Sequence, residues 1–185
     1  DIGSEAERLS RITEDLLRLT RLDSNQMDQP EVVEVVPVLE QVMRMMSLLA
    51  QEKDTELTCR AAEDCRVLAT RGEVHQVIYN LVDNAVKYSG SHGQVHVTLA
   101  WEAGQVVLTV ADNGPGIPEE DLPRVFERFY RVDKARSRQS GGTGLGLSIA
   151  KEIVTLHQGS LRILDKEGPG LAVCLELKIE GPGHE

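Results

Sequence analysis

The chain is poor in aromatic residues and in positive charge, and it contains no long hydrophobic run. Aromatic residues make up 3% of it, so base stacking on nucleic acid is not a main theme. Its formal net charge is −10 and its pI is about 5.0, which argues against DNA or RNA as a partner, since such partners are bound through clustered positive charge. No apolar run reaches the roughly 18 residues that a membrane-spanning helix needs. We therefore expect no nucleic-acid partner and no segment inserted in a membrane.

Cysteine is also scarce. Cys59, Cys65 and Cys174 form an odd count with no close pair, which suits a reducing compartment and free thiols rather than a disulfide framework or a zinc site. The apolar fraction is 41% over 185 residues, enough for the core of one ordinary domain with something small attached. The chain opens inside an expected helix and without Met, so we expect a piece of a longer protein.

Residues 1–25 are predicted to form one helix. Leu9, Ile12, Leu16 and Leu19 are spaced in the rhythm of a helix–helix seam, with charged residues on the other faces. Such a helix needs a partner helix, from a missing N-terminal part or from another chain; the alternative is a helix packed flat on the domain behind it. Residues 26–36 follow as a linker.

Residues 37–180 are predicted to form one α+β domain, and residues 181–185 a disordered tail. The expected strands cover residues 32–36, 56–60, 66–70, 94–101, 105–111, 160–164 and 171–179. The expected helices cover residues 37–53, 71–89, 119–129 and 145–157. Strands cluster with helices between them, and several hairpins are antiparallel. This order predicts a two-layer α/β sandwich, a mixed and largely antiparallel sheet with helices on one face, preceded by a single long helix.

The helix after residue 71 has an unusual polar face. Its apolar residues fall on one arc, while Asn80, Asn84 and Lys87 fall on the opposite arc and Tyr88 lies at the seam. Asn is a mediocre helix former, so two on one face suggest a task. A carboxamide oxygen can ligate Mg²⁺, an ammonium can hold phosphate and a ring can cover a base, so the face suits Mg²⁺-nucleotide. The alternative is a surface helix with chance amides. Asp83 is expected to point in an adjacent direction and to matter much less.

A turn follows the strand that ends near residue 111. Asp112 at the strand end can accept a hydrogen bond from the exocyclic amine of adenine, so it is a candidate reader of ATP over GTP. Gly114 and Gly116 allow the backbone to approach the base, because they lack Cβ. The alternative is an ordinary tight turn.

A glycine-rich run lies directly before the helix at residues 145–157. It consists of Gly142, Thr143, Gly144, Leu145, Gly146 and Leu147, preceded by one more glycine. Backbone N–H groups at a helix N-terminus suit phosphate, although the run matches neither the Walker loop nor the dinucleotide fingerprint. The alternative is a flexible linker, against which the two leucines argue.

Positive charge is concentrated between the two glycine motifs. The cations there are Arg124, Arg128, Arg131, Lys134, Arg136 and Arg138. A strongly acidic chain that gathers positive charge on one loop is expected to address an anion with it, the alternative being a solvated loop.

These four pieces, in this order, resemble one family. Residues 80–88 look like the N box of bacterial sensor histidine kinases, residues 112–117 like their first glycine box, residues 126–131 like their F box and residues 142–147 like their second glycine box. The opening helix is similar to the second helix of their dimerisation and phosphoacceptor hairpin. The resemblance spans nearly the whole chain.

The resemblance implies a nucleotide site for ATP and Mg²⁺ with a nucleotide lid. The residues it implies are Asn80, Asn84, Lys87, Tyr88, Asp112, Gly114, Gly116, Ile117, Phe129, Arg131, Gly142, Thr143, Gly144, Leu145, Gly146 and Leu147. Asn84 is implied as the Mg²⁺ ligand with Asn80 as a second candidate, Lys87 and Arg131 as phosphate contacts, and Asp112 as the reader of adenine. Related ATPases carry Glu where Asn80 stands; Asn cannot act as a general base, which favours transfer to a protein over hydrolysis.

The sequence also departs from the family. None of the five histidines has the setting of the acceptor His, so no self-phosphorylation of this chain is expected. Where the family has Ser or Thr after a Gly-x-Gly near the last strand, Leu171 and Ala172 follow, and a small change in packing is expected.

The sequence therefore predicts the ATP-binding catalytic domain of a sensor histidine kinase. The expected partners are the phosphoacceptor hairpin of a homodimeric parent and a response regulator receiver domain. The expected location is cytoplasmic, with the parent anchored in the bacterial inner membrane. The rival interpretations are an ATPase or serine kinase of the same fold and a non-catalytic nucleotide-sensing module.

Overall fold

The computed structural model describes residues 2–23, 29–132 and 144–164 with their side chains, and the backbone of residues 173–180. In chain order the elements are α1 (Ile2–Asp23), β1 (Glu31–Glu34), α2 (Val35–Glu52), β2 (Glu56–Ala61), β3 (Arg66–Ala69), α3 (Arg71–Tyr88), β4 (Gln94–Glu102), β5 (Gln105–Asp112), the 3₁₀ helix η1 (Glu119–Arg124), α5 (Gly146–Leu156), β6 (Ser160–Leu164) and β7 (Val173–Glu180). None of the helices in these ranges is long and apolar enough to cross a bilayer.

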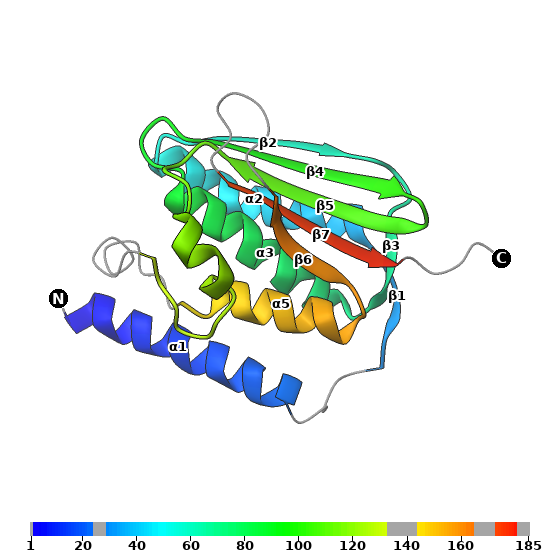
Figure 1. The fold of residues 1–185 in the computed structure, drawn as a ribbon, viewed down its shortest axis with the longest axis horizontal. Helices are drawn as coiled ribbons and strands as arrows, with labels where there is room; N and C mark the ends of the chain where they lie inside the picture. Colours follow the sequence, from blue (N-terminus) through cyan, green and yellow to red (C-terminus); the bar gives the residue numbers. More distant parts are fainter. Residues whose placement is uncertain (1, 24–28, 133–143, 165–172, 181–185) are drawn as a thin grey trace.

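The domain has two layers. A five-stranded sheet in the order β2-β4-β5-β7-β6 forms one layer, and α2, α3 and α5 cover one of its faces (Figure 1). The β2–β4 pair is parallel, while β4–β5, β5–β7 and β6–β7 are antiparallel. The predicted mixed, largely antiparallel α/β sandwich is therefore confirmed.

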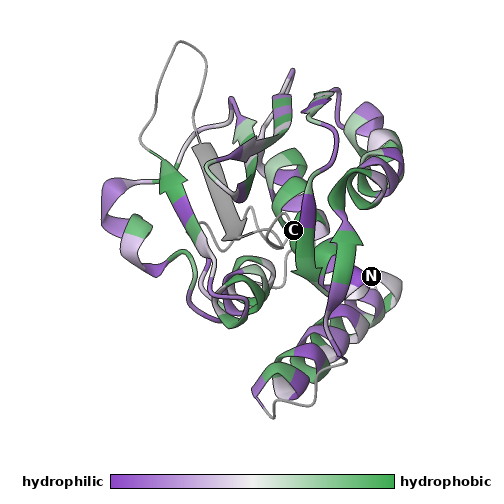
Figure 2. Ribbon diagram, turned by 90° about the vertical axis from the view of Figure 1, so that its right-hand side faces the viewer, coloured by the Kyte–Doolittle hydropathy of each residue, from purple (hydrophilic) through white to green (hydrophobic). Residues whose placement is uncertain are grey.

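The core lies between the two layers. On β4, Val95, Val97 and Leu99 are buried while His96 and Thr98 are exposed, as the alternation in the sequence predicted. The buried side chains of α3 belong to the same core cluster, and Figure 2 shows hydrophobic segments on both the strands and the helices. This burial of apolar area is the main stabilising term of the fold, at about 25 cal/mol per Å².

One expectation about local structure was confirmed and another was wrong. The strand expected at residues 32–36 is present as β1, which pairs antiparallel with β3 from Glu31↔Ala69 to Glu34↔Arg66, although α2 already begins at Val35. The helix expected at residues 119–129 is the shorter 3₁₀ helix η1, which contains Pro123. Proline lacks an N–H and clashes with the preceding turn, so an α-helix does not continue there.

Helix α1 packs along α5 on the side away from the sheet (Figure 1). Leu19 is buried and Leu22 packs against the core, whereas Leu9 and Leu16 of the predicted seam are 57% and 41% exposed. Hydrophobic and hydrophilic bands alternate along the helix (Figure 2). The last turns of α1 therefore pack on the domain, while Leu9 and Leu16 nearer its start remain exposed, and a partner helix for them stays a prediction.

Candidate functional site

Helix α3 begins where the sequence predicted, through a capping box. The Glu73 backbone N–H donates to Thr70 Oγ1 over 3.2 Å, and the Thr70 backbone N–H donates to Glu73 Oε2 over 3.1 Å. Two N–H groups that the first turn leaves without helical partners are thereby satisfied. The cap fixes the start of α3 and so the angular position of the asparagines further along it.

Asn80 is buried, which corrects its expected place on the solvent-facing arc. Asn80 is only 8% exposed. Its Nδ2 donates to the carbonyl oxygen of Gly146 over 3.1 Å, and its Oδ1 accepts from Gln76 Nε2 over 2.7 Å. The reason is tertiary: the first residue of α5 lies against this turn of α3. Both ends of the amide are therefore engaged inside the protein.

Asn84 lies one turn further along α3 and is half-buried. No hydrogen bond from its side chain occurs among the residues that the structure describes. An amide in this state keeps its oxygen available to a cation. Of the two asparagines, Asn84 is the one whose amide fits an added ligand.

Lys87 is paired with Asp83. Lys87 Nζ lies 2.8 Å from Asp83 Oδ2, and the two side chains are 16% and 17% exposed. Sequence reasoning left Asp83 outside the site, although the spacing of four residues on one helix was the signal that could have found it. The predicted phosphate ligand thus has a carboxylate partner of its own.

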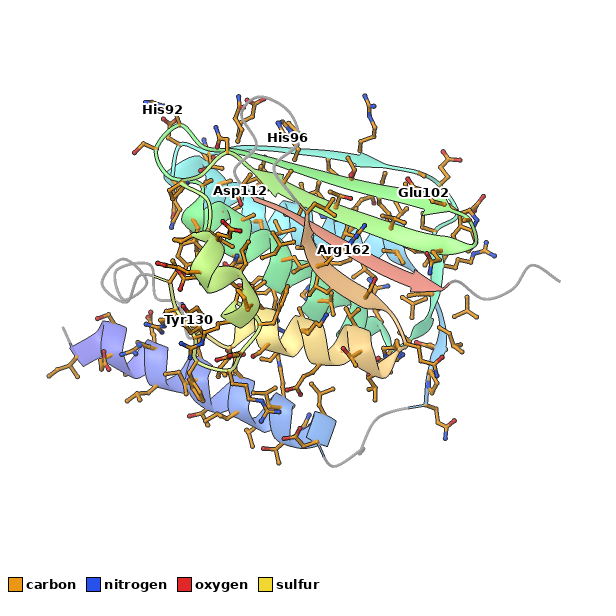
Figure 3. All side chains as sticks on the ribbon, viewed as in Figure 1. His92, His96, Glu102, Asp112, Tyr130 and Arg162 are labelled. Atoms are coloured by element: carbon orange, nitrogen blue, oxygen red, sulfur yellow. The ribbon has the colours of Figure 1, made fainter. Side chains whose placement is uncertain are left out.

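Asp112 ends β5 in a buried position at one end of the sheet (Figure 3). Burial raises the pKa of this carboxyl from its ordinary 3.8 to about 6, although a hydrogen bond from the Gly114 N–H, 2.9 Å from Oδ1, lowers it. The second oxygen, Oδ2, has no partner among the described residues. A buried carboxylate with one unsatisfied oxygen strongly favours a ligand that donates a hydrogen bond to it over one that cannot.

The turn after Asp112 is held against the end of α3. A Cβ added to Gly114 would lie 2.3 Å from the carbonyl oxygen of Tyr88, so only glycine allows this approach. Asn113 closes the turn, because its Oδ1 accepts from the backbone N–H of Gln94 over 2.7 Å. The structure thereby joins Asp112 and Gly114 to half-buried Tyr88, as expected of one site.

The remainder of this turn carries two more candidates. Gly116 has a φ of +81°, and Ile117 after it is half-buried.

Phe129 and Gly144 bring the F box to the second glycine box. The Phe129 N–H donates to the Gly144 carbonyl oxygen over 2.9 Å, and both residues have positive φ, +63° and +77°. A Cβ on Gly144 would lie 3.0 Å from the Phe129 backbone. The Phe129 ring itself is 53% exposed, and half-buried Arg131 follows two residues later.

The second glycine box leads directly into α5. Leu145 is fully buried and its carbonyl accepts from Ser148 Oγ over 2.7 Å, Gly146 opens the helix beside Asn80, and Leu147 packs on the core. This packing refutes the interpretation of residues 144–147 as a flexible linker. Gly142 and Thr143 lie outside the described residues, as do Lys134, Arg136 and Arg138 of the basic stretch.

Two of the basic residues, Arg124 and Arg128, make ion pairs within the protein. Arg124 pairs with Glu127 over 3.1 Å and lies over the Tyr130 ring, 4.4 Å from its centroid. Tyr130, in turn, hydrogen-bonds to Asp121. Arg124 is thus paired with a carboxylate three residues away in the sequence.

Arg128 joins three segments that are distant in sequence. Its Nη2 lies 3.0 Å from Asp23 at the end of α1 and 2.6 Å from Glu152 on α5. This contact was not predictable from the sequence, since it depends on how α1 packs.

A second contact that the sequence did not predict clamps the far ends of α3 and α5. His157 Nε2 lies 2.7 Å from Glu73 Oε2, with the side chains 15% and 10% exposed. Although burial opposes it, hydrogen bonds from His157 and Thr70 lower the pKa of Glu73. Together with the bond from Asn80 to Gly146, this pair ties both ends of α5 to α3.

Known proteins share the sequence and the arrangement of this chain. A family model described as "Histidine kinase-, DNA gyrase B-, and HSP90-like ATPase" matches residues 69–181. The sensor-like histidine kinase SenX3 of Mycolicibacterium smegmatis is 35% identical over 175 residues, which cover 94% of this chain and 46% of that protein. The sensor histidine kinase WalK of Bacillus subtilis is 35% identical over 179 residues, 94% of this chain and 29% of that protein. The chain thus spans less than half the length of these relatives.

Solved structures of histidine kinases have a similar fold. The mycobacterial sensor histidine kinase MprB is 30% identical with a TM-score of 0.73, and the match covers 83% of this chain and 100% of that chain. The histidine kinase ThkA, solved in complex with the response regulator protein TrrA, shares the fold at 24% identity and a TM-score of 0.75, over 98% of this chain and 49% of that chain.

Proposed function

Because the chain belongs to the histidine kinase-, DNA gyrase B- and HSP90-like ATPase family, as the catalytic domain of a sensor histidine kinase, we propose that it binds Mg²⁺-ATP in one site and supplies the γ-phosphoryl group to a histidine. The site lies between the last turns of α3, the turn after β5 and the start of α5. The acceptor histidine and the partners of the whole protein are part of the same proposal.

The base is assigned to the end of β5. Asp112 would accept a hydrogen bond from the exocyclic amine of adenine on its free oxygen, with Gly114, Gly116 and Ile117 against the ring. Burial makes the discrimination sharp, because guanine offers a carbonyl at that position and would face another acceptor. Tyr88, which lies against Gly114, would cover the ring.

The phosphates are assigned to Lys87, Arg131 and the start of α5. Lys87 supplies up to three donors and Arg131 a planar fork. The first backbone N–H groups of α5 have no helical partners, and at a helix N-terminus they favour an anion. Gly142 to Leu147 would wrap the chain of phosphates, with Phe129 behind Gly144.

Asn84 is assigned to the magnesium ion. Its fit rests on the amide oxygen, which no described side chain engages, and on the preference of Mg²⁺ for oxygen ligands. Asn80 fits less well, because its oxygen already accepts from Gln76. When bound, Mg²⁺ would neutralise phosphate charge; the chain's own task is to hold the nucleotide in line with the acceptor.

The observation that carries transfer rather than hydrolysis is the state of Asn80. It occupies the position at which the related ATPases hold a water-activating Glu, and it is buried with both ends of its amide hydrogen-bonded. An amide has no proton-accepting role at neutral pH. The site therefore lacks a base at the position where hydrolysis needs one.

We further propose that α1 is the second helix of the phosphoacceptor hairpin, as the exposed seam residues Leu9 and Leu16 support. The histidine then passes its phosphoryl group to an aspartate of a response regulator, in line with the complex solved for ThkA. The domain would work on the cytoplasmic side of the inner membrane, where the parent is anchored.

The test follows the γ-phosphate. The chain is incubated with γ-labelled Mg²⁺-ATP and a separate fragment that carries the complete hairpin of the parent. Acid-labile, base-stable label on the hairpin is the expected result, since phosphohistidine has this stability. Free labelled phosphate without labelled hairpin would establish an ATPase instead, and label on a serine would establish a serine kinase. Asn84→Ala serves as the control that removes the proposed metal ligand.

A further inference from the structure

Asp83 has a relation to the proposed phosphate ligand that the proposed function does not use. Its Oδ2 lies 2.8 Å from Lys87 Nζ, and both side chains are less than one-fifth exposed. On the last three turns of α3, Lys87 is the one cationic side chain and Asp83 the one anionic side chain. Without a nucleotide the pair cancels, and this face of α3 presents no net charge.

Binding of a phosphate to Lys87 changes the surroundings of Asp83. The ammonium would have to leave Asp83 or share itself between the carboxylate and the phosphate. A carboxylate that loses its partner in a poorly solvated position is costly, and here it would also lie beside another anion. A nucleotide without a metal ion therefore meets opposition from Asp83.

A divalent cation reverses this balance. Asn84, the proposed ligand, lies three residues before Lys87 on α3, so an ion held there would stand beside the phosphate that Lys87 binds and would offset the phosphate charge that opposes Asp83. We propose, on the basis of the proposed nucleotide site, that Asp83 determines specificity for metal-loaded nucleotide. It neutralises Lys87 when no nucleotide is bound and so disfavours ATP that arrives without Mg²⁺.

The test measures affinity with and without the metal. Dissociation constants for ATP are measured by calorimetry, in EDTA and in excess Mg²⁺, for the 185-residue chain and for Asp83→Asn. We expect Asp83→Asn to bind metal-free ATP about fivefold more tightly, as loss of a partly buried ion pair implies, and to bind Mg²⁺-ATP within about twofold of the wild type. Asp83→Ser, which also removes the charge, is expected to behave in the same way.

Asp64→Asn is the matched control. Asp64 lies before β3, is 86% exposed and adopts a φ of +60° that Asn tolerates. It removes the same charge far from Lys87, so the ratio of the two dissociation constants is expected to stay at the wild-type value.

Two results would overturn the inference while leaving the nucleotide site intact. An unchanged ratio in both Asp83 variants would show that the carboxylate does not oppose metal-free ATP. Weaker binding in both conditions would show that Asp83 orients Lys87 instead. If the wild type bound no ATP in either condition, the proposed function itself would fall, and the inference with it.

Discussion

Asn80 Nδ2 donates a hydrogen bond to the carbonyl oxygen of Gly146, 3.1 Å away, and so ties the middle of α3 to the first residue of α5. The two residues are 66 positions apart in the sequence. Since one belongs to the N box and the other to the second glycine box, a single side chain sets the distance between two walls of the site.

Replacement of Asn80 by Ala is expected to destabilise the domain. It leaves the half-buried Gly146 carbonyl and Gln76 amide without this partner, which costs about 1–3 kcal/mol of the free energy of unfolding. Urea denaturation monitored by circular dichroism measures this loss. Asn84→Ala is the control, expected to leave stability within about 0.5 kcal/mol because its amide holds nothing in place. Equal losses in the two variants would contradict the structural role of Asn80.

Replacement of Asp112 by Asn is expected to stabilise the nucleotide-free domain in a pH-dependent way. The pKa of Asp112 is raised to about 6, so between pH 4 and pH 6 the folded state holds a proton that the unfolded state has lost. Stability therefore falls as pH rises through this window, by at most about 3 kcal/mol. Asn is never charged and avoids this loss.

Thermal melts at pH 4 and pH 7.5 check this prediction. Asp112→Asn should melt higher than the wild type at pH 7.5 and close to it at pH 4, where both side chains are neutral. The same gain at both pH values would mean that packing, not ionisation, is responsible. Loss of ATP affinity in this variant, measured in parallel, would separate its role in binding from its effect on stability.

Replacement of Gly114 by Ala is expected to displace the turn after β5. The added Cβ would lie 2.3 Å from the backbone oxygen of Tyr88, and a backbone atom cannot move aside as a flexible side chain does. We expect ATP affinity to fall by at least about tenfold and stability by about 1–3 kcal/mol, as for other overpacked sites. Gly72→Ala is the matched control.

Gly72 lies in the first turn of α3, and a Cβ there meets nothing within 4 Å. Alanine is the better helix former, so this control should gain up to about 1 kcal/mol and bind ATP as before. If the two variants behaved alike, the close approach at Gly114 would be without consequence.

Replacement of Asp23 by Asn is expected to loosen the end of α1. Of its two partners among the described residues, Arg128 then keeps Glu152, and α1 loses this charged link to the F box. Amide hydrogen exchange near Leu19 should speed up about two- to fivefold, the range for a largely exposed ion pair. Glu5→Gln, which removes an ion pair within α1 itself, should leave exchange at Leu19 unchanged. Faster exchange in Glu5→Gln alone would contradict the assignment.

Local patterns predicted much of the fold correctly. The alternation of Val95, Val97 and Leu99 gave β4, and the Gly-terminated helical spacing after Leu145 gave α5 almost to the residue. These predictions held because side-chain periodicity follows directly from backbone geometry. The pattern of residues 119–129 failed, because Pro123 and the turn chemistry after it outweigh apolar spacing.

The candidate site was predictable in part, for the same reason. Motif order placed Asp112, Gly114 and Tyr88 in one site, and the structure brings them together. The order of the motifs could not show that Asn80 is buried or that Asp83 pairs with Lys87. Nor could it show that Arg128 forms ion pairs with residues of α1 and α5. Each of these depends on which group the tertiary structure brings within hydrogen-bonding distance of the polar side chain.

By itself the sequence determined the family, the kinds of side chain in the proposed nucleotide site and the positions of most strands and helices. All of these are fixed by residue type and spacing along the chain. Only the tertiary structure decided which polar groups are already satisfied within the protein. Hydrogen bonds and ion pairs act over about 3 Å, so Asn80 and Asn84, alike in the sequence, differ because α5 covers one and not the other.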